Sequence, residues 1–337
     1  MMRLKKRKKY YTRFLIGALF TIIFLSNILY VNAWNNGSYA YNKTDYDYET
    51  DYATHDWIAE HALDQLIKED ESNWQWLNQA EMKKIFLLGT EAPDNSEVET
   101  TLDGEKIEGF GDRSKHHIYF YEDGEVLEDD AALLAKKWGN LADAHKEEGK
   151  KEQAAFYLGA MTHYIADMSM YAHIAQNNND ERYPGVDFDG WETHEQHSKV
   201  EGRVGTRTND YEDRDEFFEL GSIDIGKDKN PYDIAVDLAW ETYADESHGG
   251  AHDAKWLHEN FFSDWAANKD DRDNDNSTQQ AYYDRTEVLL TEAVESIASA
   301  MAYIGGVSSS GFDPMWIIGI IVIVAVIAIP TVLKLLN

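Results

Sequence analysis

The sequence contains no cysteine. This absence excludes disulfide bonds, thiolate metal sites and a cysteine nucleophile. Any zinc site must therefore be built from histidine, aspartate, glutamate or backbone atoms. Internal repeats are also missing, and stretches with the alternating pattern of β-strands are few. We therefore expect an all-α fold without a repeat architecture.

Basic residues are scarce beside acidic ones. The chain has 31 Lys and Arg against 62 Asp and Glu, which gives a net charge of −31, and seven of the basic residues fall within positions 1–33. A surface this acidic repels nucleic acid and anionic lipid rather than attracting them. An adaptation to a salty medium would give the same charge, so the charge alone does not name a substrate.

Residues 1–33 have the pattern of a signal peptide. A basic segment (1–13) precedes an apolar run (14–30), and the small residues of Val-Asn-Ala (31–33) supply a cleavage site. Cleavage after Ala33 would make Trp34 the first residue of the mature chain. The alternative is an uncleaved anchor, because about 17 apolar-rich residues approach the lower limit for spanning a bilayer.

The other end of the chain, residues 315–336, is a second apolar run and carries Lys334 near its end. This pattern predicts a transmembrane helix with a short cytoplasmic tail. Residues 307–314 form a linker of small residues, too short for the spacer of a lipid-anchor signal. We therefore expect residues 34–306 to be exported as one domain and held at the outer face of the cell membrane.

Helical periodicity covers most of this domain, so we expect a single all-α, multi-helix body. Two intervals, 89–126 and 178–196, are rich in Gly, Asp and Asn and are predicted to be loops. The predicted helices are 54–67, 74–88, 129–148, 151–176, 232–246, 252–267 and 278–304.

The stretch HYIADMSMYAH (163–173) places three metal-binding residue types in an apolar helix. A lone histidine there would more often be a core residue. His163 and Asp167 are four residues apart, lie on one helix face and can share a metal ion. In a continuous helix His173 would lie roughly 80° round and about 15 Å along from His163. The spacing therefore suggests several metal ions along the helix, with Asp167 between them.

A second pair of this kind lies in HSKVE (197–201). His197 and Glu201 are again four residues apart, and with His173 they would form a His₂Glu set. Three protein ligands and an open water position are typical of catalytic zinc. Taken alone, each pair would more often be an ordinary surface hydrogen bond.

At these motifs the chain resembles the zinc-dependent bacterial phospholipases C, which are related to the single-strand-specific zinc nucleases. The resemblance runs over residues 34–201 and is carried by FYLGAMTHYIAD with its His-x₃-Asp-x₅-His and by HSKVE. Further matches are THDWI (54–58), GTEAPD (89–94) and HIYFYEDG (117–124).

The resemblance implies three zinc ions held by nine residues. The first ion would be bound by Asp94, His117, His163 and Asp167. The second would be bound by the amino nitrogen and carbonyl oxygen of an N-terminal Trp34, by His55 and by the shared Asp167. The third would be bound by His173, His197 and Glu201. His116 is an alternative to His117, since a one-residue shift would exchange them.

The activity that the resemblance implies is zinc-assisted hydrolysis of phosphate esters, with Asp94 or a zinc-bridging hydroxide as the base. A phospholipid is the expected substrate, because the closing acid of HSKVE is Glu as in the lipases. Positions 37, 95 and 114 correspond to the choline pocket of phosphatidylcholine enzymes. Gly37, Asn95 and Ser114 offer no acidic or aromatic surface there, so choline specificity is not expected.

Two alternatives remain open. One is a zinc-dependent single-strand nuclease or 3′-nucleotidase, which the acidic surface disfavours. The other is a non-catalytic surface protein stabilised by zinc. A His/Asp/Glu cluster with open positions is more often catalytic than structural, so this last alternative is the weakest.

Overall fold

The computed structural model describes residues 34, 39–121, 124–174, 202–205, 207–208, 217–244 and 276–306. Several predicted features lie outside these ranges. They are the signal peptide, the linker, the transmembrane helix at 315–336, the helix at 252–267, and the proposed ligands His197 and Glu201.

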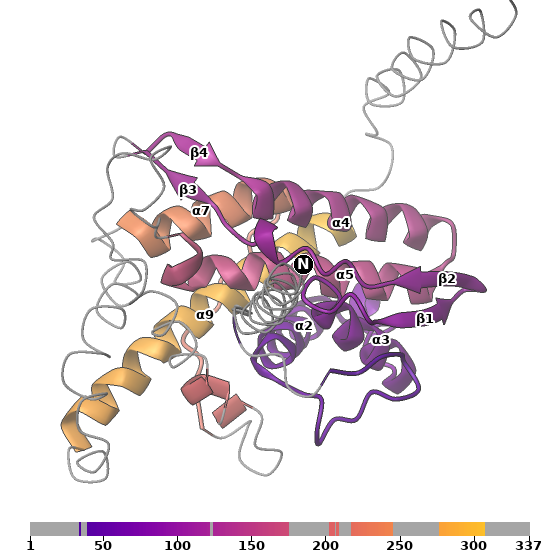
Figure 1. Ribbon diagram of the computed structural model, residues 1–337, viewed down its shortest axis with the longest axis horizontal. Helices are drawn as coiled ribbons and strands as arrows, with labels where there is room; N and C mark the ends of the chain where they lie inside the picture. Colours follow the sequence, from indigo (N-terminus) through magenta and orange to yellow (C-terminus); the bar gives the residue numbers. More distant parts are fainter. Residues whose placement is uncertain are drawn as a thin grey trace, which may run out of the picture.

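The described chain is mostly helical, as expected, and its helices pack around a common core (Figure 1). The long helices are α2 (Thr54–Trp74), α3 (Ala80–Glu91), α4 (Asp130–Glu147), α5 (Lys151–Ala166), α7 (Pro231–Ala244) and α9 (Asn276–Gly306).

Helix α5 is the centre of this arrangement. Nearly all its side chains are buried, because its sequence is apolar on every side rather than on one stripe. It packs against α3 and α4 along its length and also contacts α2, α7 and α9 (Figure 1). A helix enclosed in this way holds its residues rigidly, which suits it to carry a metal site.

Two glycines bring the backbones of α3 and α5 into direct contact. A Cβ atom on Gly159 would lie 1.9 Å from the carbonyl oxygen of Phe86, and one on Gly89 would lie 2.1 Å from the carbonyl oxygen of Phe156. Neither helix can accept a side chain at this crossing without moving away. The close approach matters for the site, since Thr90 follows Gly89 directly and contacts His163.

We predict that Gly159→Ala lowers the free energy of unfolding by at least the ~1–3 kcal/mol typical of an overpacked core. The clash is with backbone atoms, which cannot rotate aside. Gly306→Ala is the matched control, because a Cβ there meets nothing within 4 Å. Urea denaturation of both variants measures the difference. Equal midpoints would contradict the close contact between the backbones of α3 and α5 at Gly159.

Helix α5 ends earlier than the periodicity predicted. It stops at Ala166 and is followed by two 3₁₀ turns, Asp167–Ser169 and Tyr171–His173, with Met170 extended between them (φ −101°, ψ 116°). The prediction of a continuous helix to residue 176 was wrong, and so was the position calculated for His173. The apolar residues continue past the break, so periodicity alone does not reveal it.

Another predicted boundary was wrong near the start of the domain. Helix α2 continues to Trp74 through a kink at Asp70 (φ −146°, ψ 74°), and the next helix begins at Ala80 instead of residue 74. At the kink the Asp70 carboxylate accepts a hydrogen bond from the backbone N–H of Asn73 at 3.4 Å, in addition to bonds from Ser72 Oγ and Asn73 Nδ2. Such local bonds compete with the helical backbone bonds.

The interval 89–126, predicted to be loop, contains two small antiparallel hairpins. Strands β1 (Glu99–Leu102) and β2 (Glu105–Glu108) are joined by Asp103 and Gly104, whose φ angles are 49° and 81°. An Asp-Gly pair with positive φ is a favoured hairpin turn. Strands β3 (Tyr119–Phe120) and β4 (Val126–Glu128) pair near the N-terminus of α4 (Figure 1).

Within the described residues one helical segment, Gln280–Gly306 of α9, has the length and composition to cross a membrane. It contacts α2, α5 and α7, and 56% of its apolar window is buried inside the protein, as expected for a core helix. The predicted anchor at 315–336 is a separate segment and stays a prediction.

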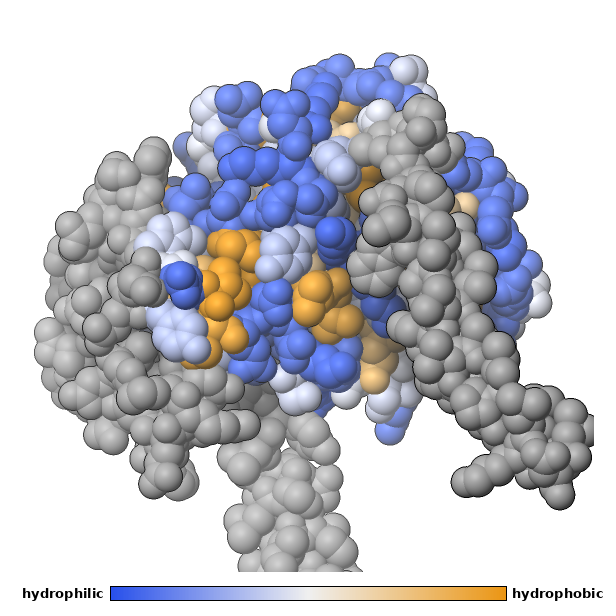
Figure 2. Space-filling view, turned by 90° about the horizontal axis from the view of Figure 1, so that it is seen from above, coloured by the Kyte–Doolittle hydropathy of each residue, from blue (hydrophilic) through white to orange (hydrophobic). Residues whose placement is uncertain are grey.

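Both hydrophilic and apolar side chains are exposed on the described part of the chain (Figure 2). Figure 2 shows one face, on which apolar side chains gather in separate areas among hydrophilic ones. The large hydrophobic side chains exposed in the described ranges are Tyr41, Tyr121, Val126 and Leu133.

Candidate metal centre

His163 is fully buried near the end of α5, and its ring is oriented by the neighbouring helix. Its Nδ1 lies 2.6 Å from the carbonyl oxygen of Thr90 and donates to it, which leaves Nε2 as the lone-pair nitrogen. Burial and the nearby His55 and His116 hold the pKa of His163 well below its usual value. A neutral imidazole with one nitrogen fixed by a carbonyl is the state of a metal-binding histidine.

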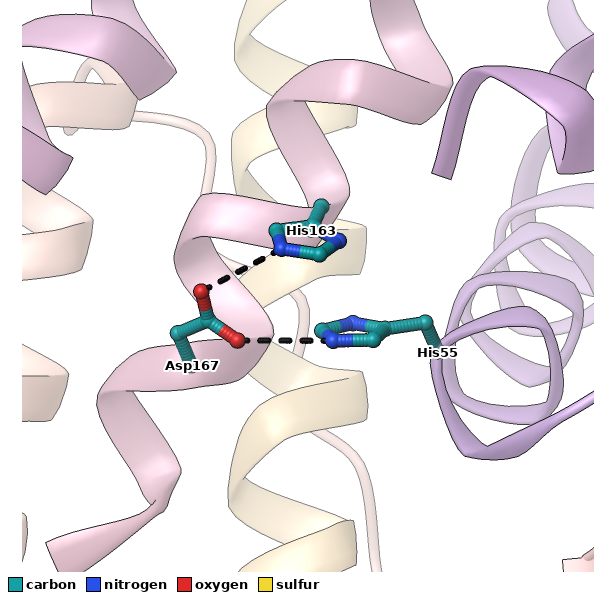
Figure 3. A group of neighbouring side chains, drawn as sticks. All are labelled: His55, His163 and Asp167. Atoms are coloured by element: carbon teal, nitrogen blue, oxygen red, sulfur yellow. Dashed lines mark ion pairs between the residues drawn. The ribbon is translucent and has the colours of Figure 1, made fainter. Parts of the chain in front are cut away.

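Asp167 lies between three imidazoles. Its Oδ1 is 3.4 Å from His55 Nε2, while its Oδ2 is 3.4 Å from His163 Nε2 and 3.0 Å from His116 Nδ1. Figure 3 shows Asp167 with two of them, and the rings of His55 and His163 stack at 3.9 Å. The two oxygens thus face different partners, which is the arrangement needed to bridge two metal ions.

His116, rather than His117, joins Asp94 and His163. Its Nδ1 is 3.7 Å from Asp94 Oδ1 and 3.2 Å from His163 Nε2, and its side chain is buried. On its other side, Nε2 lies 3.5 Å from Asp112 Oδ1, which also accepts a hydrogen bond from Tyr164. Asp112 therefore orients the His116 ring as an outer carboxylate orients a metal-bound histidine.

The electrostatics of His116 favour a positive charge at this point. Burial alone would lower the pKa of His116, but the carboxylates of Asp112, Asp167 and Asp94 outweigh it and raise that pKa to about 10. At neutral pH the metal-free protein therefore keeps a proton on His116. The proton occupies the position at which a metal cation would balance the same carboxylates.

His117 and His173 lie together on the other side of this segment. Their rings stack at 5.3 Å, and His173 Nδ1 donates to the carbonyl oxygen of His116 at 2.6 Å. His117 is thus next to the residue assigned to the third zinc ion and not beside Asp94. Its role as a ligand of the first ion stays a prediction, which this geometry disfavours relative to His116.

Trp34 is anchored beside Asp167. It is fully buried, and its indole Nε1 donates to both the carbonyl oxygen of Ala166 and Ser169 Oγ at 3.0 Å. These two acceptors flank Asp167 in the sequence. Further along, the backbone N–H of Ala40 donates to Glu91 Oε2 at 2.9 Å, so the chain at Ala40 is also held against α3.

The donor atoms suit zinc in type and spacing. Two groups of buried donors each lie within 4.8 Å: His55, His163 and Asp167, and Asp94, His116 and His163. Atoms bound tetrahedrally to zinc at about 2.0–2.1 Å are themselves about 3.3 Å apart. The measured separations of 3.0 to 3.7 Å bracket that value. Imidazole nitrogens and carboxylate oxygens are also the zinc ligands available to a chain without cysteine.

Comparison with known proteins identifies the family of this chain. The family model for zinc-dependent phospholipase C matches residues 54–251. The chain belongs to the zinc-dependent phospholipase C family. No curated protein sequence matches it significantly.

Two solved structures are similar to this phospholipase C family member. The α-toxin of Clostridium perfringens from avian strain SWCP is 17% identical with a TM-score of 0.43, and the α-toxin of Clostridium absonum is 16% identical with a TM-score of 0.41. The match covers 77% of this chain in both cases, and it spans 65% and 66% of the respective toxins.

Sequence reasoning did not identify the residues that support this family member's metal centre. Asp56 is one of them: its Oδ1 accepts from Thr90 Oγ1 at 2.6 Å and its Oδ2 accepts from the backbone N–H of Ala53. It therefore ties the start of α2, which carries His55, to the residue that orients His163. Burial raises the pKa of Asp56 to about 7, although the Thr90 hydroxyl opposes the shift.

A usable signal for His116 was present in the sequence. From His116 to Phe120 the side chains alternate between buried and half-exposed, so His116, Ile118 and Phe120 all face inward. Ile118 and Phe120 are apolar and two positions apart, so they identify the inward-facing positions, because side chains alternate along a strand. The second histidine, His117, falls on the outer face.

We predict that His116→Ala weakens zinc binding by more than the roughly 10–100-fold that loss of an outer partner costs. His117→Ala is the matched control, and it should not weaken binding of the zinc ion at Asp94 and His163. Zinc content after dialysis against a graded chelator measures the difference. The reverse order of the two variants would restore His117 as the ligand.

Proposed function

We propose that this protein is a zinc-dependent phosphodiester hydrolase that acts as a phospholipase C outside the cell. The buried Asp167, with imidazoles on both of its oxygens, is the observation that carries the proposal. Membership of the zinc-dependent phospholipase C family supports it. The specific substrate and the number of zinc ions are part of the proposal.

The proposed ligands follow from the contacts. We assign one zinc ion to Asp94, His116, His163 and Asp167, and a second to His55, Asp167 and the Trp34 terminus. A third ion would take His173 with His197 and Glu201, which lie outside the described residues. When bound, zinc neutralises charge on phosphoryl oxygens and lowers the pKa of a coordinated water.

The protein's own groups would then complete the reaction. Asp94 is almost fully buried and lies at the end of the chain segment that follows α3. Its carboxylate would accept the proton of the attacking water, which is the role of a general base. Asp112 would hold His116, and Thr90 would hold His163, so that the ligands do not reorganise during the reaction.

Export and anchoring complete the proposal. Cleavage of the signal peptide after Ala33 would free the amine of Trp34, whose indole is already fixed beside Asp167. A free amine carries a lone pair that can bind a metal, whereas an amide nitrogen does not. The helix at 315–336 would then tether the enzyme at the outer face of the membrane, close to phospholipid.

We predict that the full chain, exported by a bacterial host, releases phosphorylated headgroup and diacylglycerol from mixed liposomes. A zinc chelator should abolish release, and Asp94→Asn should slow it by roughly 100-fold or more. Glu97→Gln is the matched control, since that side chain is exposed three residues away.

Single-stranded DNA and RNA are offered in parallel with the liposomes. Chelator-sensitive release of nucleotides in place of lipid headgroups would show that the protein is a zinc-dependent nuclease instead. Zinc binding without turnover of either substrate would contradict the enzymatic proposal and favour a structural cluster.

We also predict that blocking cleavage at Ala33 leaves the protein with less zinc. A bulky charged residue at this position, as in Ala33→Asp, prevents recognition by signal peptidase. The uncleaved chain should purify with fewer zinc ions than the wild type, and with lower activity. N-terminal sequencing and metal analysis of both forms test this, and equal zinc content in a verified uncleaved chain would remove Trp34 from the ligand set.

A further inference from the structure

Arg113 contacts Asp94 and is the more exposed of the two residues. Its Nε donates to the carbonyl oxygen of Asp94 at 2.9 Å and lies 4.0 Å from Asp94 Oδ1. The Arg113 side chain is 25% exposed and that of Asp94 is 1% exposed. Arg113 therefore places a partly exposed cation in direct contact with the buried Asp94.

The guanidinium is fixed in place. Its Nη2 donates to the hydroxyl of Tyr39 at 3.2 Å, in addition to the bond from Nε to Asp94. Arg113 also begins the 3₁₀ turn Arg113–Lys115, which leads directly into His116. The same short turn therefore positions both His116 and the positive charge of Arg113 at the candidate metal centre.

A fixed arginine at this point suits an anion. Arginine stays protonated at any physiological pH, and its planar fork matches phosphate and carboxylate oxygens. The chain as a whole carries a net charge of −31. This negative charge repels an anionic substrate. A preorganised cation next to the centre would offset this repulsion where the phosphate binds.

We propose that Arg113 binds an anionic oxygen of the substrate beside Asp94. This inference rests on the proposed function, because it takes the substrate to be a phosphodiester. The oxygen has two possible sources, a non-bridging oxygen of the scissile phosphate or an anionic group of the headgroup. Either source makes Arg113 a substrate-binding residue, beyond its support of Asp94.

The test compares Arg113→Gln, Arg113→Lys and, as matched control, Lys115→Gln, an exposed cation of the same turn. Each full-length, zinc-loaded protein is assayed on liposomes with zwitterionic or anionic headgroups. Inorganic phosphate binding is measured separately by calorimetry, and zinc content by metal analysis.

Arg113→Gln should raise KM by roughly 10-fold or more, as expected for loss of a hydrogen bond to a charged group. Arg113→Lys should recover part of the loss, and zinc content should be unchanged in both. A loss common to all headgroups, with weaker phosphate binding, would identify the phosphoryl oxygen. A loss confined to anionic lipids would identify the headgroup.

Two outcomes would overturn the inference. One is unchanged KM and unchanged phosphate affinity in Arg113→Gln. The other is a fall in kcat accompanied by zinc loss that Arg113→Lys does not recover, since that would mean Arg113 acts only by positioning Asp94. If the wild type hydrolyses no lipid, the proposed function fails, while the phosphate-binding measurement still decides the role of Arg113.

Discussion

The candidate metal centre is built around one buried carboxylate, that of Asp167. A carboxylate removed from water is costly unless positive charge or hydrogen-bond donors surround it. Here the protonated His116 faces Oδ2 at 3.0 Å, His55 Nε2 lies 3.4 Å from Oδ1, and the lone-pair nitrogen of His163 lies 3.4 Å from Oδ2, where a metal ion could join the two. These histidines come from three separate parts of the chain. One buried carboxylate therefore contacts three segments that are far apart in the sequence.

The backbone is shaped to meet that requirement. The glycine crossing of α3 and α5 brings the Thr90 carbonyl close enough to hold His163. Directly after His163, α5 stops at Ala166, and the extended Met170 turns the chain so that His173 reaches the carbonyl oxygen of His116. A straight helix would have carried His173 along the helix axis and away from this contact.

Much of this arrangement could be predicted from sequence. The helices at 130–147, 231–244 and 276–306 agree with the periodicity, and the pair His163 and Asp167 does share one helix face. Local patterns work there because the relevant contacts lie within one helix. They failed at the end of α5, where the apolar residues continue through a backbone break.

The residues that sequence reasoning missed act across long separations in the chain. Asp112 is four residues from His116, yet its partner Tyr164 lies on α5. Asp56 acts through Thr90, 34 residues away. Neither residue belongs to a recognisable motif. A supporting carboxylate only has to lie close to its partner in the folded protein, and the sequence does not reveal that distance. The choice between His116 and His117 depends on a different feature, namely which of the two neighbouring side chains is buried.

The proton on His116 explains how such a centre can form before its metal arrives. Without a cation, Asp94, Asp112 and Asp167 would place three carboxylates around one buried point, and their repulsion would oppose folding. Because those carboxylates raise the pKa of His116 to about 10, a proton supplies the missing charge in the metal-free protein. A zinc ion held by the same carboxylates would take the place of this proton in a site that is already formed. Folding and metal loading would then be separate steps that use the same histidine.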